Sequence, residues 1–277
     1  MGLRSTVALI SVFGLCVVVA CDRNREPQTQ TSPTTTASAV TSSSAAVETT
    51  PTKPIPPTAT PTLGYTPKLV PMKGQRGSVT FDVSLPQVDG SGNAAARDRF
   101  NQGMQTALDD LINEVNDRKY IGVQIWTGGV DLRPGEESSR VTGITEHLLA
   151  GVTVFGWEGA HGAHPNLDVT TLVINTATAQ PITFADVFPN QEVARARLRE
   201  LVPQLDSTGR LKAGGSNLGD TRQSLEHEKF EKWLPTPDGL RVYVAVYTAL
   251  GHFASVTVPW AKIRDFVAPA ELPILLS

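Results

Sequence analysis

The segment covering residues 22–67 limits what the rest of the chain can fold into. Thr, Ser, Pro and Ala dominate it, and its first aromatic residue is Tyr65. A segment of this composition has too few apolar side chains to bury a core, so we expect a disordered, partly extended stalk over residues 21–67. The folded part must then be built from residues 68–277, which is long enough to be stable by core packing alone.

The N-terminus has the pattern of an export signal. Arg4 is followed by an apolar run that ends at Ala20, directly before Cys21. This run is too short for a permanent membrane helix, and we expect residues 1–20 to be a signal peptide. A cysteine directly after a small residue resembles the bacterial lipobox, in which the thiol is diacylated, for example with palmitate. An ordinary signal peptide with a chance cysteine, or an uncleaved anchor, is the alternative.

The lipobox resemblance implies a cellular location and attachment to a membrane. Two acyl chains give stable anchoring, so we expect a lipoprotein held at the extracytoplasmic face of the cell membrane through Cys21. Cys16 lies in the removed segment and Cys21 carries lipid, which leaves no thiol for a disulfide, a nucleophile or a metal site. The formal net charge is −3, and loss of Arg4 makes it −4, which argues against nucleic acid as a partner.

Apolar periodicity locates the first elements of the folded part. From Val79 to Leu85, apolar residues alternate with polar ones, which predicts a half-buried strand that Pro86 ends. An apolar stripe at three- and four-residue steps from Phe100 to Val115 predicts a helix. Ser91 or Asn93 is available as its N-cap.

The remaining elements are shorter. Thr183 and Asp186 have the spacing of a capping box, and Asp238-Gly239 is a turn signal within a hairpin. We expect strands at 120–126, 141–149, 152–157, 169–175, 232–234, 240–247 and 255–260, and helices at 191–201, 222–230 and 261–267. Strands mixed with a few helices, without regular βαβ alternation, predict an α+β fold with mainly antiparallel sheets. We divide it into an N-terminal strand-helix-strand subdomain (68–155) and a C-terminal domain (156–277).

The order of several short motifs resembles a known family. The motifs lie at 159–166 (Gly-Ala-His-Gly-Ala-His-Pro-Asn), 170–175, 181–188, 230–246 and 256–260. They are similar to the C-terminal domain of the RsiV-type anti-sigma factors, which also occurs in mycobacterial secreted immunogenic proteins. The earlier segment at 79–115 is similar to the small domain that often precedes it, also beside some peptidoglycan deacetylases.

The resemblance implies a non-catalytic α+β fold and, in the anti-sigma factors, a surface that binds lysozyme. This chain has a lipobox where those proteins have a sigma-binding region and a transmembrane helix, so control of a sigma factor is not implied. We expect a non-enzymatic binding or sensor domain of the cell envelope that recognises a lysozyme-like protein or a wall glycan.

One loop concentrates residues that suit recognition. Glu158, His161, His164 and Asn166 lie in the Gly-rich segment between two expected strands, and loops on a rigid scaffold often carry binding residues. The alternative is a metal-dependent hydrolase in which His161 and His164 hold zinc. Two histidines three residues apart leave a third ligand undefined, so we expect no metal and no other cofactor. The chain has no Gly-x-Ser-x-Gly elbow and no phosphate-binding Gly-rich motif, and no catalytic residue is expected.

Overall fold

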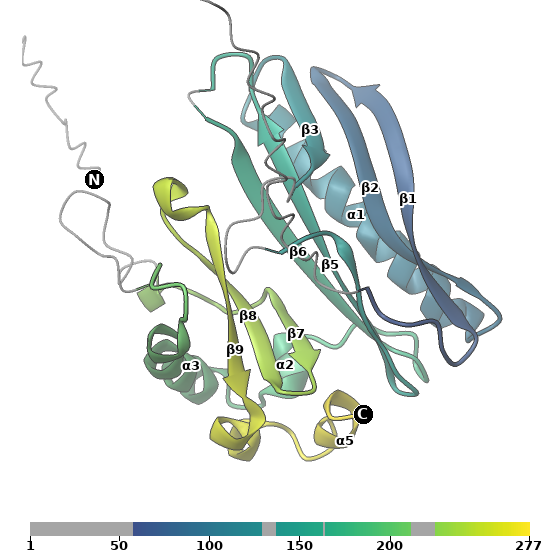
Figure 1. Ribbon diagram of the computed structural model, residues 1–277, viewed down its shortest axis with the longest axis vertical. Coiled ribbons are helices and arrows are strands. Elements are labelled where there is room, and N and C mark those ends of the chain that lie inside the picture. Colours follow the sequence, from purple (N-terminus) through teal and green to yellow (C-terminus); the bar gives the residue numbers. More distant parts are fainter. Residues whose placement is uncertain (1–57, 129–136, 163, 212–224) are drawn as a thin grey trace, which may run out of the picture. The chain divides into compact units, whose positions relative to one another are not determined.

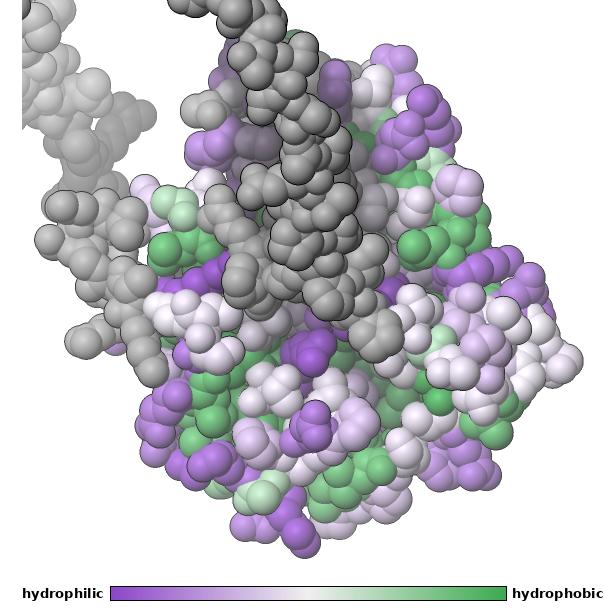
Figure 2. Space-filling model, viewed as in Figure 1, coloured by the Kyte–Doolittle hydropathy of each residue, from purple (hydrophilic) through white to green (hydrophobic). Residues whose placement is uncertain are grey.

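A computed structural model describes residues 58–128, 137–162, 164–211 and 225–277. The expected signal peptide, Cys21 and most of the expected stalk lie outside these residues, as does part of the helix expected at 222–230. Within the described part of the chain, no helix combines the length and apolar character needed to cross a bilayer. In the coloured part of Figure 2, apolar patches are separated by polar residues.

The described strands form two sheets, and four α-helices accompany them (Figure 1). The strands are β1 (Tyr65–Arg76), β2 (Val79–Gly90), β3 (Val123–Thr127), β4 (Arg140–Ile144), β5 (Leu148–Glu158), β6 (Asn166–Asn175), β7 (Trp233–Thr236), β8 (Gly239–Ala245) and β9 (Phe253–Pro259). The helices are α1 (Ala94–Asp117), α2 (Phe184–Val187), α3 (Gln191–Leu205) and α5 (Leu272–Leu275).

The larger sheet is organised around β5. Its order is β1-β2-β3-β5-β4, and β6 pairs with the other edge of β5 along its whole length. The β2–β3 pair is parallel, and the other pairs are antiparallel. The smaller sheet, β7-β8-β9, is antiparallel throughout. The predicted α+β class with mainly antiparallel pairing is therefore confirmed.

The first hairpin differs from the sequence prediction in two ways. Strand β1 was not predicted, and it begins at Tyr65, inside the segment expected to be a stalk. Pro86 does not end β2, which continues to Gly90. The reason is that β3 pairs only with Val79–Asp82. Beyond Asp82 no described strand pairs with this side of β2, and the backbone nitrogen of Pro86 points to this side. A missing N–H is harmless there.

The same register places two more prolines. The backbone N–H groups of Ser84 and Val88 bond to side chains on the side of β2 opposite β1. The backbone nitrogen of Pro86, which lies between them in the same alternation, therefore also points away from β1. The β1 partners of Ser84, Pro86 and Val88 are Pro71, Leu69 and Pro67. The backbone nitrogens of these three residues must then point to the outer edge of β1. Because two of the three are prolines, that edge lacks two N–H donors.

Side chains form hydrogen bonds with the backbone groups on the open side of β2, the side on which no described strand pairs with it beyond Asp82. The side-chain amide of Asn101 in α1 accepts from Val88 N at 2.8 Å and donates to Val88 O at 2.9 Å. Thr127 Oγ1 accepts from Ser84 N at 2.6 Å. A helix residue therefore takes the place of a neighbouring strand, and the backbone of β2 keeps its hydrogen bonds.

Helix α1 covers the larger sheet with the predicted apolar stripe. Asn93 is its N-cap, accepting from the backbone N–H groups of Ala95 and Ala96, as one of the two caps expected. The buried side of the helix includes Phe100, Met104 and Leu108. The stripe is core, and it fixes the helix on the strands that carry the loop at 158–166.

The smaller sheet shares a core with α2, α3 and one face of the larger sheet. The predicted capping box is present, with Thr183 and Asp186 each bonding to the other's backbone N–H. The predicted hairpin has the pairing Thr236↔Gly239. The helix expected at 261–267 is wrong, since that segment forms two 3₁₀ turns, Trp260–Lys262 and Arg264–Phe266. The subdomain boundary expected at 155/156 falls inside β5, so the larger sheet draws on both expected parts.

Candidate functional site

The loop at 158–166 connects β5 to β6, as the sequence predicted. Ala160 N donates to Ile121 O at 3.0 Å, and Gly162 N donates to Gly159 O at 2.8 Å. The first bond ties the loop to the chain just before β3, and the second closes a tight turn. His161 lies on this turn with its side chain exposed, while Glu158 is half-buried against Gly162. Ala163 lies outside the described residues.

His164 faces a histidine from the other sheet. Its ring centroid lies 6.2 Å from that of His252 in an edge-on arrangement, and its Nδ1 lies 3.3 Å from the carbonyl of Pro165. His252 follows Gly251 in the turn before β9 and has a φ of 69°. A non-glycine residue in this left-handed region is uncommon and is found more often at functional sites.

A cleft of about 610 Å³ opens beside this histidine pair. It is bounded by the end of β5, the start of β6, the segment at 227–232 and the adjoining ends of β8 and β9. Of the residues predicted from the sequence, Asn166 lines the cleft and His164 stands next to His252, which also lines it. Glu158 and His161 are not among the lining residues. The structure thus brings two of the four predicted residues to one site.

An ion pair crosses the cleft wall. Lys232 Nζ lies 2.9 Å from Asp168 Oδ1, and both side chains remain partly exposed. Tyr243 also lines the cleft, and its hydroxyl donates to buried Glu137 Oε2 at 2.7 Å. Burial, and then the charge of Glu137, raise the pKa of Tyr243 well above its ordinary value. Tyr243 therefore stays protonated as a hydrogen-bond donor at neutral pH.

Aromatic rings form the other side of the site. Trp157 lines the cleft and packs against the core beneath α1. The ring of Tyr120 lies 5.4 Å from that of Trp157, centroid to centroid, at a tilt of 46°. Tyr120 is 40% exposed, so the two rings present an accessible aromatic surface beside the loop.

The histidines are not gathered into a metal site in the described part of the chain. There, no group of three or more His, Cys, Asp or Glu side chains is placed to hold an ion. His161 is exposed and is not among the residues that line the cleft, and His164 contacts one other imidazole among the described residues, that of His252. The two-histidine zinc arrangement weighed from the sequence therefore gains no third ligand among the described residues.

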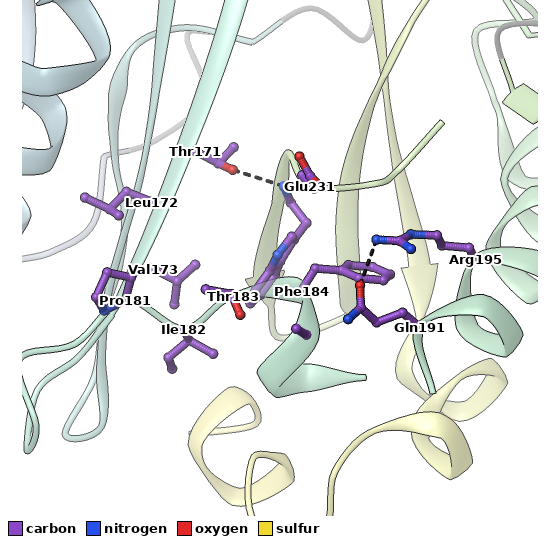
Figure 3. A pocket seen from close by; sticks show the side chains of 12 residues that line it. Thr171, Leu172, Val173, Pro181, Ile182, Thr183, Phe184, Gln191, Arg195 and Glu231 are labelled. Atoms are coloured by element: carbon purple, nitrogen blue, oxygen red, sulfur yellow. Dashed lines mark hydrogen bonds between the residues drawn. The ribbon is translucent and has the colours of Figure 1, made fainter. Parts of the chain in front are cut away.

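A second hollow of about 410 Å³ lies further along β6 (Figure 3). Arg195 crosses it over the ring of Phe184, 5.3 Å from the centroid, and donates to Gln191 Oε1 at 2.8 Å. Thr171 Oγ1 accepts from Trp233 N at 3.0 Å. These contacts join α3 to α2 and β7 to β6, and we interpret this hollow as part of the packing between the sheets.

Four residues of the cleft were missed as binding residues in the sequence. Trp157 was predicted only as part of a strand, and the predicted recognition residues did not include Asp168 or His252. Lys232 lies 64 residues from Asp168, so their pairing has no local signal. The Gly251-His252 dipeptide before a strand marks a turn, which is the one sequence feature that points to this wall.

Comparisons with known proteins give no family assignment. No protein-family model and no curated protein matches the sequence. The chain is similar to the crystal structure of a DUF3298 family member from Bacteroides fragilis, with a TM-score of 0.49 and 12% identity. It is also similar to that of a DUF3298 family protein from Pseudomonas aeruginosa, with a TM-score of 0.46 and 12% identity. In each case 76% of this chain and 96% of the other are covered.

Proposed function

We propose that this protein is an exported, lipid-anchored binding module of the cell envelope, and that the cleft beside the loop at 158–166 is its ligand site. The observation that carries the proposal is a cleft lined by Trp157, by the Asp168–Lys232 ion pair and by Asn166 of the predicted recognition loop, with the ring of Tyr120 packed beside Trp157. Sites for small ligands commonly combine apolar walls with a few placed polar groups.

The proposed role is binding rather than catalysis. Asp168 is paired with Lys232, and the hydroxyl of Tyr243 is committed to Glu137. Groups held in such pairs keep fixed positions, which suits recognition of a ligand's shape and hydrogen-bonding pattern. The resemblance to the RsiV-type domain adds two candidate ligands, a lysozyme-like protein and a wall glycan.

The anchor is tested on the full chain in a bacterial host. Wild-type protein should incorporate radiolabelled palmitate and partition into detergent, and Cys21→Ala should do neither. The Cys16→Ala variant is the matched control, because it removes a cysteine from the segment expected to be cleaved. Equal labelling of wild type and Cys21→Ala would refute the lipid anchor.

The binding role is tested with the full chain in detergent micelles. The protein is mixed with purified lysozyme in one experiment and with insoluble peptidoglycan in another. Retention by either, lost in Trp157→Ala and kept in Tyr247→Ala, supports the cleft as the ligand site. Release of soluble fragments from the peptidoglycan would make the chain a hydrolase and overturn the non-enzymatic role, and retention by neither would refute the binding proposal.

A further inference from the structure

We infer that the cleft binds a neutral or amino-bearing glycan, with one sugar ring lying on the indole of Trp157. The inference rests on the binding role proposed above and commits it to one chemical class. It follows from three observations: where the aromatic rings lie, which polar side chains share their face of the sheet, and which charges surround the cleft.

The aromatic surface suits a sugar ring. Trp157 is half-buried, with one part packed on the core and another lining the cleft, and Tyr120 extends this surface outward. The C–H groups on one face of a pyranose carry partial positive charge, and they pack on the electron-rich face of an aromatic ring. An indole held by core packing offers this surface at little cost in conformational entropy.

The sheet register places polar groups beside the indole. Asn166 is the cross-strand partner of Trp157, and Asp168 is the partner of Phe155. Residues directly opposite in an antiparallel pair project from the same face, so Trp157, Asn166 and Asp168 share one face of the sheet. An amide and a carboxylate next to an aromatic ring can hydrogen-bond the hydroxyl groups around the edge of a stacked sugar.

The ion pair keeps free hydrogen-bonding capacity. Lys232 occupies one oxygen of Asp168, and a carboxylate accepts up to about four hydrogen bonds. The ammonium group of Lys232 has three donors and uses one in this contact. The pair therefore offers both acceptors and donors to hydroxyl groups, which have both functions themselves.

Charge selects against anionic ligands. The cleft is lined by four carboxylates, Glu114, Asp168, Glu228 and Glu231, and by two lysines, Lys229 and Lys232. Arg118, which pairs with Glu114, offsets one carboxylate and leaves three against two. A lining with more carboxylates than lysines favours neutral or amino-bearing sugars over phosphate-rich or sulfated polymers.

The recessed position of the indole favours a thin ligand. A cleft of about 610 Å³ lies in the range of roughly 300–1,000 Å³ that is usual for small ligands. A single glycan strand can enter such a cleft and reach Trp157, Asn166 and Asp168 together.

The test uses the full chain in detergent micelles and defined oligosaccharides. The probes are a β-1,4-linked N-acetylglucosamine hexamer, a β-1,4-linked glucose hexamer and dextran sulfate. Binding is followed by titration calorimetry and by tryptophan fluorescence, which stacking on Trp157 should change. We expect at least one uncharged hexamer to bind and dextran sulfate to bind more weakly.

Matched variants locate the site. Trp157→Ala should weaken hexamer binding by about tenfold or more, as expected for an aromatic anchor. Tyr120→Ala and Asp168→Asn should also weaken it. Their controls are Tyr247→Ala, an exposed tyrosine outside the cleft lining, and Asp82→Asn, whose carboxylate forms a 2.9 Å pair with Lys73 on β1. If Trp157→Ala fails to fold, Trp157→Phe, which keeps an aromatic ring, should abolish the fluorescence change.

The outcomes separate this inference from the binding role. Binding of lysozyme that depends on Trp157, without binding of either hexamer, overturns the glycan inference and leaves the binding role standing. Tighter binding of dextran sulfate than of the hexamers also overturns it. Hexamer binding that is equal in Trp157→Ala and wild type places the glycan elsewhere and refutes the site.

Discussion

The hydroxyl of Tyr243 in β8 donates to the carboxylate of Glu137, 106 residues earlier in the chain, and so connects the smaller sheet to the segment just before β4. Glu137 is 2% exposed and also contacts the guanidinium groups of Arg140 and Arg241. This network, Glu137 with Arg140, Arg241 and Tyr243, places charged groups between the two sheets, where each depends on its partners.

Removing the carboxylate should therefore destabilise the protein strongly. Glu137→Ala removes the carboxylate that pairs with buried Arg140 and accepts from buried Tyr243, and we expect a loss of about 3–5 kcal/mol in the free energy of unfolding. Urea denaturation followed by circular dichroism measures this loss. Exposed Glu146→Ala is the control and should change stability by no more than about 0.5 kcal/mol. Equal stability of the two variants would contradict a structural role for the network.

The network also predicts a loss of stability at alkaline pH. Burial, and then the charge of Glu137, raise the pKa of Tyr243, so the folded state holds this proton more tightly than the unfolded state. The resulting stabilisation is fully present below the unfolded pKa of about 10 and is lost as the pH rises through the folded pKa. Urea denaturation between pH 8 and the alkaline limit of folding should show a decline that is shallower in Tyr243→Phe. Some decline should remain in that variant, because burial also raises the pKa of Tyr65.

The two hydrogen bonds between the Asn101 side chain and the backbone of β2 can be tested directly. Asn101→Ala removes both hydrogen bonds to the backbone of Val88, and we expect it to lower the free energy of unfolding by about 1–3 kcal/mol. Asn113→Ala, an exposed change of the same type in α1, corrects for helix propensity. If both variants lose the same amount, the amide does not stabilise the open side of β2.

The histidines of the recognition loop should affect binding rather than stability. Both are exposed, so replacing His161 and His164 together by Ala should change the free energy of unfolding by no more than about 0.5 kcal/mol for each. Binding to the ligand found in the experiments above should weaken by about tenfold if the loop is a hot spot. A large fall in melting temperature with unchanged binding would make both residues structural. A stoichiometric zinc ion that the double variant loses would support the hydrolase alternative.

Short-range sequence patterns correctly predicted the strands and helices that depend mainly on residues close together in the chain. The alternation from Val79 to Leu85, the apolar stripe of α1 and the capping box at Thr183 each correspond to an observed element. Strand β1 was missed because its prolines and lysines are typical of a loop, and they are tolerated only because β1 is at the sheet edge. Whether a proline ends a strand depends on its neighbours, as Pro86 shows.

The site was predicted only in part for the same reason. The loop between β5 and β6 follows from the sequence, and in the structure its residue Asn166 lines the cleft and His164 lies beside His252. His252 and Lys232 reach the cleft from the smaller sheet, and the packing of one sheet on another has no short-range pattern. Trp157 lines the cleft because residues from distant parts of the chain pack around it, and the apolar periodicity of its own strand gives no information about those neighbours.

The prolines on the outer edge of β1 affect how copies of the protein meet each other. Lipid anchoring, as proposed here, would concentrate many copies in the plane of one membrane. An unprotected twelve-residue edge strand would then be a template on which neighbouring chains could add strand by strand. Because Pro67 and Pro71 interrupt the donors of that edge, a continuous intermolecular ladder cannot form along β1, and crowded copies are kept from polymerising through it.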